Sequence, residues 1–221
     1  MNVGVALINP LYEGNVGAVA RLMANYSLSN LYLIDSCDIG DEAYRRARQG
    51  QGILDTAIHT DVLPEYNTII TTTGVVGGKT NILRTPIALS EITPDFVSTA
   101  GDILLVFGRE DHGLSNKELR LGDFVLHIEA SSSYPVLNLS HAVGITLHHL
   151  HTLEPNVIDG ASRDQKDAFL TLLQRIQNRL EITNTCKDNQ QLVFRKLLSQ
   201  GLSKKECNIL FGFLRNIQNE L

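Results

Sequence analysis

The chain has 221 residues, of which 43% are hydrophobic, 19% charged and 6% aromatic. This length and balance are typical of one globular domain, with or without a small appendage, and exclude a disordered or collagen-like chain. No apolar run approaches the roughly 18 residues that a membrane-spanning helix needs, and the N-terminal residues are typical of a strand rather than a signal peptide. The three scattered cysteines form neither a disulfide framework nor a zinc spacing, so we expect a cytoplasmic protein.

The net charge of -5 is unevenly distributed along the chain. Residues 1–155 contain nine Lys/Arg and seventeen Asp/Glu, a net charge of -8, whereas residues 156–221 contain ten and seven, a net charge of +3. Pro155 marks the change in composition and favours a helix end followed by a linker. We therefore predict two domains, 1–155 and 156–221. Because the basic residues are segregated, an acidic total does not exclude RNA as a partner.

Short β-type runs alternate with amphipathic helical stretches in the first part. The predicted strands are Val3–Ile8, Asn30–Ile34, Thr68–Thr72, Ile103–Phe107 and Phe124–Ile128, and the predicted helices are Val16–Asn25, Asp41–Gln49, Ser115–Leu119 and Leu139–Leu150. Such alternation predicts an α/β domain with a mainly parallel sheet. Ligands of these sheets bind beyond the carboxyl ends of the strands, so the residues that follow the strands are the candidates for a site.

The second part shows helical periodicity instead. Its apolar residues recur at helical spacing within Phe169–Leu180, Leu192–Leu198 and Ile209–Ile217. Ser203, with Glu206 three residues later, forms a capping box at the start of the third helix. The pattern predicts a small helical bundle with a moderately basic surface.

The first candidate motif follows the first strand and runs from Asn9 to Arg21. Asn15 is a good helix N-cap, Gly17 permits the close approach of another backbone, and Arg21 lies further along the same helix. A helix N-terminus with an amide and a guanidinium nearby can hold a phosphate. The alternative is an ordinary capped helix with a solvated arginine.

The second motif, 104–115, follows a strongly apolar strand and places charged residues between Gly108 and Gly113. Charged residues directly after a buried strand seldom serve packing, so we expect this loop to approach a ligand. Glu110 can accept hydrogen bonds from backbone groups or neutralise a cation. The alternative is a strand–turn–helix junction with Ser115 as N-cap.

The third motif runs from Tyr134 to Val143. Pro135 favours extended backbone before it, and Asn138 or Ser140 can then start a helix. Backbone groups at 137 and 139 can hydrogen-bond an adenine edge while their leucine side chains cover its faces. A capped core helix is the alternative.

Residues Thr71–Thr80 are similar to a phosphate-binding P-loop but do not match its register. The motif requires glycine at the position occupied by Thr73, and Pro86 follows within two turns of where the P-loop helix would begin. A glycine-rich loop after a strand can still bind another ligand.

Two further clusters have an ordinary and a functional interpretation. The histidines of one helix end lack a carboxylate or cysteine that would complete a metal site, so we predict no metal; they are His141, His148, His149 and His151. Three arginines close together form either a solvated helix face or a contact to RNA phosphates; they are Arg45, Arg46 and Arg48.

Together, the three motifs resemble those of the SPOUT RNA methyltransferases, in the family's order and at about its spacing. The matching segments are Asn15-x-Gly17-x-x-Ala20-Arg21, Leu105–Glu110 with Gly113-Leu114, and Leu137–Ser140 with Ala142-Val143. Within that superfamily the chain is similar to the TrmH class, and most similar to its TrmJ group of tRNA ribose 2′-O-methyltransferases. The likeness covers nearly all of 1–150 and more loosely 160–220, where Asn208–Ile217 resembles the TrmJ helical extension.

The resemblance implies an α/β fold with a deep trefoil knot, a homodimer with sites at the subunit interface, and S-adenosylmethionine bound in a bent form. By motif match the cofactor pocket is lined by Thr72, Thr73, Gly74, Gly108, Glu110, Ile128, Leu137 and Leu139. Asn15 and Arg21, from the partner subunit, would face the target ribose, with Asn138 and Ser140 close by. The expected target is the ribose of nucleotide 32 in the tRNA anticodon loop. The helical extension, 156–221, would bind tRNA or support the dimer.

The implied chemistry needs no metal, because a sulfonium is already an activated methyl donor. The family's proposed base corresponds to Arg21, but a guanidinium keeps its proton in proteins and is a poor base. We therefore expect Arg21 to bind phosphate and to stabilise the developing alkoxide. Three alternative functions remain. The chain could be an rRNA 2′-O-methyltransferase, which has the same chemistry and another substrate, a P-loop-like nucleotide hydrolase, or a non-catalytic RNA-binding protein.

Overall fold

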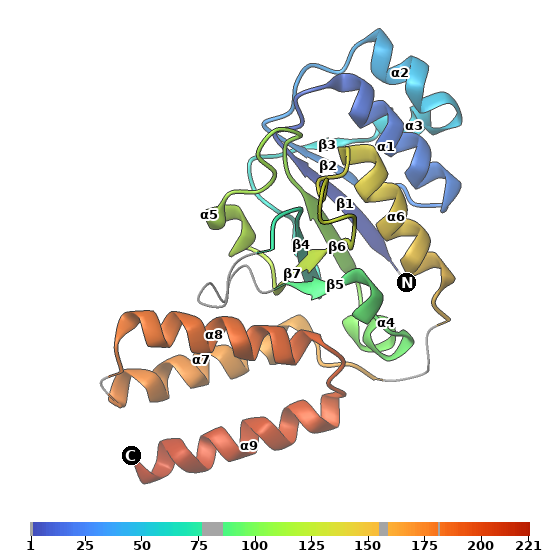
Figure 1. Cartoon of the computed structure of the whole chain (residues 1–221). Helices are drawn as coiled ribbons and strands as arrows, with labels where there is room; N and C mark the ends of the chain where they lie inside the picture. The colour runs from blue at the N-terminus through green and yellow to red at the C-terminus, as the bar shows by residue number, and fades with distance from the viewer. Residues whose placement is uncertain (1, 77–85, 155–158, 181) are drawn as a thin grey trace.

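Seven parallel strands, in the order β3-β2-β1-β6-β4-β7-β5, form one sheet (Figure 1). The computed structural model describes residues 2–76, 86–154, 159–180 and 182–221. Its strands are β1 Val3–Ile8, β2 Leu31–Ile34, β3 Ile58–His59, β4 Thr68–Thr73, β5 Ile87–Ala88, β6 Ile103–Phe107 and β7 Phe124–His127. The predicted mainly parallel α/β sheet is thus confirmed.

Every residue of the two central strands, β1 and β6, is buried. Strands covered on both faces are nearly continuous runs of Val, Ile and Leu, which is why these segments lack polar alternation. On one face the sheet packs against α1 Glu13–Asn25, α2 Asp41–Ala47, α3 Gln51–Asp55, α4 Pro94–Ala100 and α6 Leu139–Thr152. The other face is covered by α5 Asn116–Leu119 and by Leu192 from the C-terminal helices (Figure 1).

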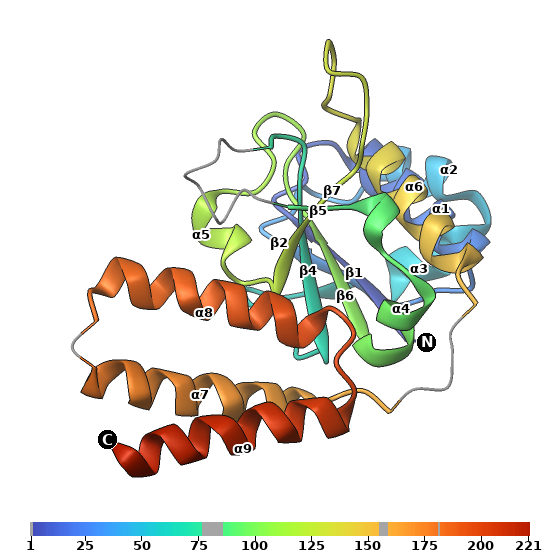
Figure 2. The same ribbon diagram turned by 60° about the horizontal axis from the view of Figure 1, so that its bottom comes forward.

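Three helices follow the sheet, α7 Arg163–Arg179, α8 Asn184–Ser199 and α9 Lys204–Glu220 (Figure 2). They share a separate apolar cluster, in which the rings of Phe169 and Phe194 lie 5.6 Å apart. Ser203 caps α9 as predicted: its hydroxyl accepts the backbone N–H of Glu206, whose carboxylate accepts the N–H of Ser203. The predicted helical character of this part of the chain is confirmed.

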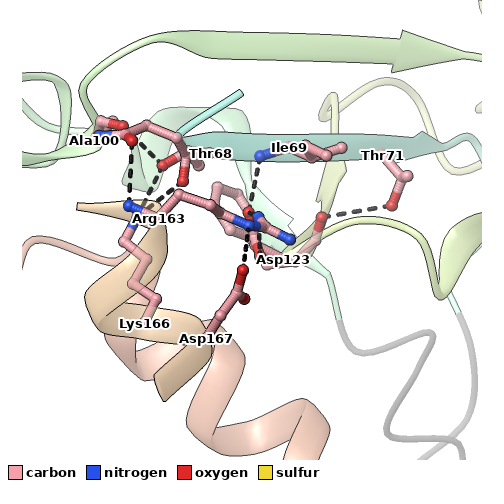
Figure 3. A network of polar contacts seen from close by, with 10 residues as sticks. Thr68, Ile69, Thr71, Ala100, Asp123, Arg163, Lys166 and Asp167 are labelled. Carbon is pink, nitrogen blue, oxygen red and sulfur yellow. Dashed lines mark hydrogen bonds and ion pairs between the residues drawn. The ribbon is translucent and has the colours of Figure 1, made fainter. Parts of the chain in front are cut away.

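A polar cluster attaches the first turn of α7 to the sheet (Figure 3). The buried carboxylate of Asp123 accepts the backbone N–H of Ile69 at 2.8 Å and the Arg163 guanidinium at 2.9 Å. Lys166 donates to the carbonyl of Asn67 and the hydroxyl of Thr68, both at 3.1 Å. These contacts lie where β4 and β7 begin, so the helices join the sheet at the end opposite the carboxyl ends of those strands.

Two predicted helix boundaries are wrong for local reasons. Helix α1 begins at Glu13 after Tyr12, so Asn15 is not an N-cap. The side-chain amide of Asn15 forms hydrogen bonds with Glu110 and Asn138 instead. Helix α2 ends at Ala47, because Arg48 takes a φ of +52° and starts a short 3-10 turn. Among the described residues, no helix is long and apolar enough to cross a membrane.

Candidate active site

One pocket lies at the carboxyl ends of β4, β6 and β7, where a ligand is expected in a parallel sheet. It has an empty volume of about 830 Å3, part of which opens to solvent. All eight residues expected to bind the cofactor line it: Thr72, Thr73, Gly74, Gly108, Glu110, Ile128, Leu137 and Leu139. Three segments that are far apart in the sequence therefore converge on one cavity.

The loop after β6 is held in shape by its own residues. A Cβ at Gly108 would lie 2.3 Å from the backbone of Gly113, so only glycine fits there. The Arg109 guanidinium donates to the Gly113 carbonyl at 2.9 Å and to both Glu118 oxygens, at 2.8 and 3.1 Å. Arg109 lines the pocket and also holds the loop in shape.

Glu118 is the counter-charge of that arginine and the N3 residue of α5. Its carboxylate also accepts the backbone N–H of Ser115 at 2.6 Å, which completes the predicted cap of this helix. Hydrogen bonds from Arg109 above all, opposed by partial burial, lower the pKa of Glu118 to about 2. The pair therefore stays ionised at neutral pH and fixes the wall of the pocket.

A chain of hydrogen bonds joins the three motifs at the edge of the pocket. The Glu110 carboxylate accepts the backbone N–H of Leu11 at 2.8 Å and the side-chain N–H of Asn15 at 2.7 Å. The Asn15 carbonyl oxygen in turn accepts from the Asn138 amide at 3.2 Å. Glu110 thus binds a backbone group, as predicted, and also orients the amide of Asn15.

Asn138 is the N-cap of α6 and the last link of this chain. Its side-chain oxygen accepts the backbone N–H of Ser140 at 2.9 Å and the Ser140 hydroxyl at 2.8 Å. With its oxygen fixed in this way, the Asn138 amide nitrogen points to Asn15. Ser140 is buried, so its hydroxyl serves to orient Asn138.

Arg21 is the one predicted catalytic residue that the structure places apart from the others. It lies six residues beyond Asn15 on α1, about 9 Å further along the helix axis. With Ala18 and Leu22 it lines a separate groove, together with the three predicted phosphate-binding arginines Arg45, Arg46 and Arg48. Within one chain, therefore, Asn15, Asn138 and Ser140 are adjacent and Arg21 is not.

Side-chain hydrogen bonds hold the end of β4 and the start of the loop after it, both of which line the pocket. The Thr72 hydroxyl donates to the Val106 carbonyl at 2.9 Å, and the Thr73 hydroxyl donates to Val75 at 3.0 Å. The sequence reasoning missed Val75 and Val136, which also line the pocket; their positions next to matched residues were the available signal. Residues 77–80 of the P-loop-like segment lie outside the described residues.

The histidines near the end of α6 have structural partners. A ring nitrogen of His149 lies 3.1 Å from the Ile92 carbonyl, and the rings of His148 and His151 pack beside Tyr26. Within the described ranges there is no group of three or more His, Cys, Asp or Glu residues that could hold a metal ion.

Comparison with known proteins identifies the family. The model of the SpoU rRNA methylase family matches residues 2–148. A tRNA (cytidine-2′-O-)-methyltransferase, TrmJ of Methanocaldococcus jannaschii, is 32% identical over 93% of this chain and 95% of its own length. The solved structure of a probable methylase family protein from Haemophilus influenzae has a TM-score of 0.66 and 27% identity, covering 99% of this chain and 97% of that one.

A third similarity concerns the fold alone. An rRNA methyltransferase from Sinorhizobium meliloti, solved with S-adenosylmethionine (AdoMet) bound, has a TM-score of 0.54 at 19% identity, covering 69% of this chain and 57% of that one. The resemblance to the TrmJ group is confirmed by relatives that match nearly the full chain. The chain belongs to the SpoU family of RNA methylases.

Proposed function

We propose that this chain methylates the ribose 2′-hydroxyl of nucleotide 32 in the tRNA anticodon loop, as a homodimer that uses S-adenosylmethionine. The observation that carries the proposal is the convergence of three loops on one pocket, with the Asn15–Asn138 amide pair at its edge. The M. jannaschii relative, named for methylation of tRNA cytidine, supports tRNA as substrate and cytidine as the first base to test.

The pocket fits the family's cofactor. The Leu137 and Leu139 side chains, with Ile128, give it apolar walls suited to the faces of an adenine ring. The Glu110 carboxylate, which also lines the pocket, has the charge that a sulfonium favours. When bound, S-adenosylmethionine supplies the methyl group as an electrophile.

The protein's own contribution is positioning and electrostatics. Glu110 and Asn138 hold the Asn15 amide from its two ends, so that the pair presents a fixed polar edge to a ribose. Holding two reactants in line can remove about 7–11 kcal/mol of a barrier in favourable cases. Arg21, contributed by the partner subunit, would stabilise the charge that develops on the 2′-oxygen.

The order of the strands supports a knot as well. After β5 at one edge of the sheet, the chain returns to place β6 between β1 and β4, and then β7 between β4 and β5. We infer that the segment leading into α6 threads through the loops around these strands as a trefoil knot. The separate core of α7–α9 supports a second domain, 156–221, for which we propose a role in binding tRNA or in supporting the dimer.

The description of the matching family model favours rRNA as the second candidate substrate. Methyl transfer from labelled S-adenosylmethionine to unmodified tRNA and rRNA, followed by mapping of the modified nucleotide, decides between them. We expect label at nucleotide 32 of tRNA. Label in rRNA alone would show that rRNA, and not tRNA, is the substrate. A folded protein that binds RNA but transfers no methyl group would overturn the proposal that the chain is an enzyme.

A further inference from the structure

The groove that contains Arg21 is not explained by the pocket chemistry. It is formed by α1, α2 and the 3-10 turn after α2, and its lining includes the exposed side chains of Arg21, Arg45, Arg46 and Arg48. Figure 1 shows α1 and α2 side by side, away from α7–α9. The basic residues of the groove are therefore a surface distinct from the positively charged C-terminal helices.

Close packing of α1 against α2 brings these arginines together. A Cβ at Gly17 would lie 2.1 Å from the carbonyl oxygen of Ala43, so the contact between the two backbones requires glycine. The carboxylate of Glu13, on α1, accepts the N–H groups of Gly40 and Ala43 at the start of α2. It thereby caps a helix whose own N-cap residue has no side chain, and it fixes α2 relative to α1.

The charges in the groove are only partly neutralised. Arg46 forms an ion pair with Glu42 at 2.7 Å. None of the ion pairs found among the described residues joins Arg21, Arg45 or Arg48 to a carboxylate. Several guanidinium groups beside one another repel, and an anionic ligand bound between them would offset that repulsion.

The backbone conformation of Arg48 also indicates that this arginine has a function. Its φ of +52° with a ψ of -117° is a conformation in which glycine is the favoured residue. The other described non-glycine residues with positive φ are Asn9, Ser27 and Asp35, all short and polar. A long basic side chain kept in a conformation that suits glycine indicates a function for the guanidinium, since strain of this kind persists at binding sites.

We propose that Arg45 and Arg48 bind the phosphodiester backbone of the RNA substrate; this rests on the proposed function. The planar guanidinium fork matches two phosphate oxygens at once. Arg46 also lines the neighbouring hollow that contains Asn15 and Asn138, but that hollow is lined as well by the carboxylates of Glu13, Asp38 and Glu42. A phosphate is therefore better placed among the arginines of the groove than in the hollow.

Binding of an unmodified tRNA transcript over a series of salt concentrations tests the proposal. We expect Arg48→Gly and Arg45→Ala each to weaken tRNA binding about tenfold and to reduce the slope of log K against log salt by about 0.7–0.9. Arg48→Gly should leave the melting temperature unchanged or higher, because it relieves the backbone. Arg120→Ala, which removes an exposed arginine at the end of α5, is the matched control and should change neither quantity.

The outcomes separate this inference from the proposed function. Unchanged tRNA affinity and salt slope in both variants overturn the groove as an RNA site, even if the wild-type enzyme methylates tRNA. Loss of affinity for polyglutamate without loss of affinity for tRNA would assign the groove to an acidic protein partner instead. A wild-type protein that transfers no methyl, yet loses tRNA affinity in both variants, would overturn the proposed function and leave the groove's role intact.

Discussion

At the scale of single residues, amide groups whose orientation is fixed by neighbours define the candidate active site. Asn138 uses its oxygen to cap α6 and its nitrogen to hold Asn15, while Glu110 holds Asn15 from the other side. These two roles of Asn138 can be separated by substitution, because an aspartate keeps the capping oxygen and loses the N–H donor.

We expect Asn138→Asp to retain the stability of the wild type within about 0.5 kcal/mol and to lower kcat at least tenfold. Asn138→Ala, which loses the cap as well, should also cost about 1 kcal/mol of folding free energy. Urea unfolding and single-turnover methyl transfer measure the two effects. Full turnover by Asn138→Asp would show that the amide contact with Asn15 has no part in the reaction.

The Arg109–Glu118 pair predicts a pH dependence of stability. Because the pKa of Glu118 falls from 4.5 to about 2 on folding, its stabilising effect is complete above pH 4.5 and is lost as the pH falls toward 2. Glu118→Gln should therefore cost about 1–2 kcal/mol at pH 7, and the difference from wild type should shrink below pH 4.5. A difference that stays constant from pH 7 to pH 3 in urea unfolding would contradict this assignment.

At the scale of elements, apolar periodicity located the five longer strands of the sheet to within about a residue. It missed β3 and β5, because two-residue strands carry no measurable period, and it missed α4, although Thr93 and Pro94 are a recognisable helix start. The eight residues that motif matching assigned to the cofactor all line one pocket. Motif matching could not separate Arg21 from Asn15, since both lie on one helix and only tertiary packing decides what each faces.

Helix α1 depends on its contact with α2. Gly17→Ala should destabilise the fold by about 1–3 kcal/mol, since the added methyl meets backbone that cannot move without displacing α2. Gly52→Ala is the matched control, because no atom lies within 4 Å of its added Cβ. Thermal unfolding that shows equal melting temperatures for both variants would contradict the close approach of the two helices.

At the scale of the whole molecule, a buried ion pair attaches the C-terminal helices to the sheet. Burial raises the pKa of Asp123, the nearby Arg163 opposes this, and the backbone N–H of Ile69 completes its hydrogen bonding. The carboxylate of Asp167 also pairs with Arg163 but is half exposed. Removing the buried partner leaves an uncompensated charge, whereas removing the exposed one does not.

Asp123→Ala should accordingly cost about 3–5 kcal/mol and expose the first turn of α7 to amide hydrogen exchange. Asp167→Ala should cost less than about 0.5 kcal/mol. Hydrogen exchange measured by mass spectrometry reports both effects on the full chain. Equal protection of α7 in the two variants would contradict the role of this ion pair in attaching the helices.

The proposed dimer also makes a prediction about shared sites. If Arg21 acts in the pocket of the partner subunit, mixed dimers of Arg21→Ala and Leu137→Asp chains contain one intact site. We expect such mixed dimers, purified with two different tags, to recover about half of the wild-type kcat. Activity no higher than that of either parent variant would place Arg21 with the pocket of its own chain.

We propose that the methyl donor binds in the pocket formed by the loops after β4 and β6 and before α6. Isothermal titration of S-adenosylmethionine into the wild type and Leu137→Asp tests it most directly, because Leu137 lines the pocket while remaining partly exposed, so its loss leaves the core intact. We predict a saturable heat in the wild type and at least a tenfold weaker affinity in the variant. Equal affinity in the two proteins would show that the methyl donor does not bind in this pocket.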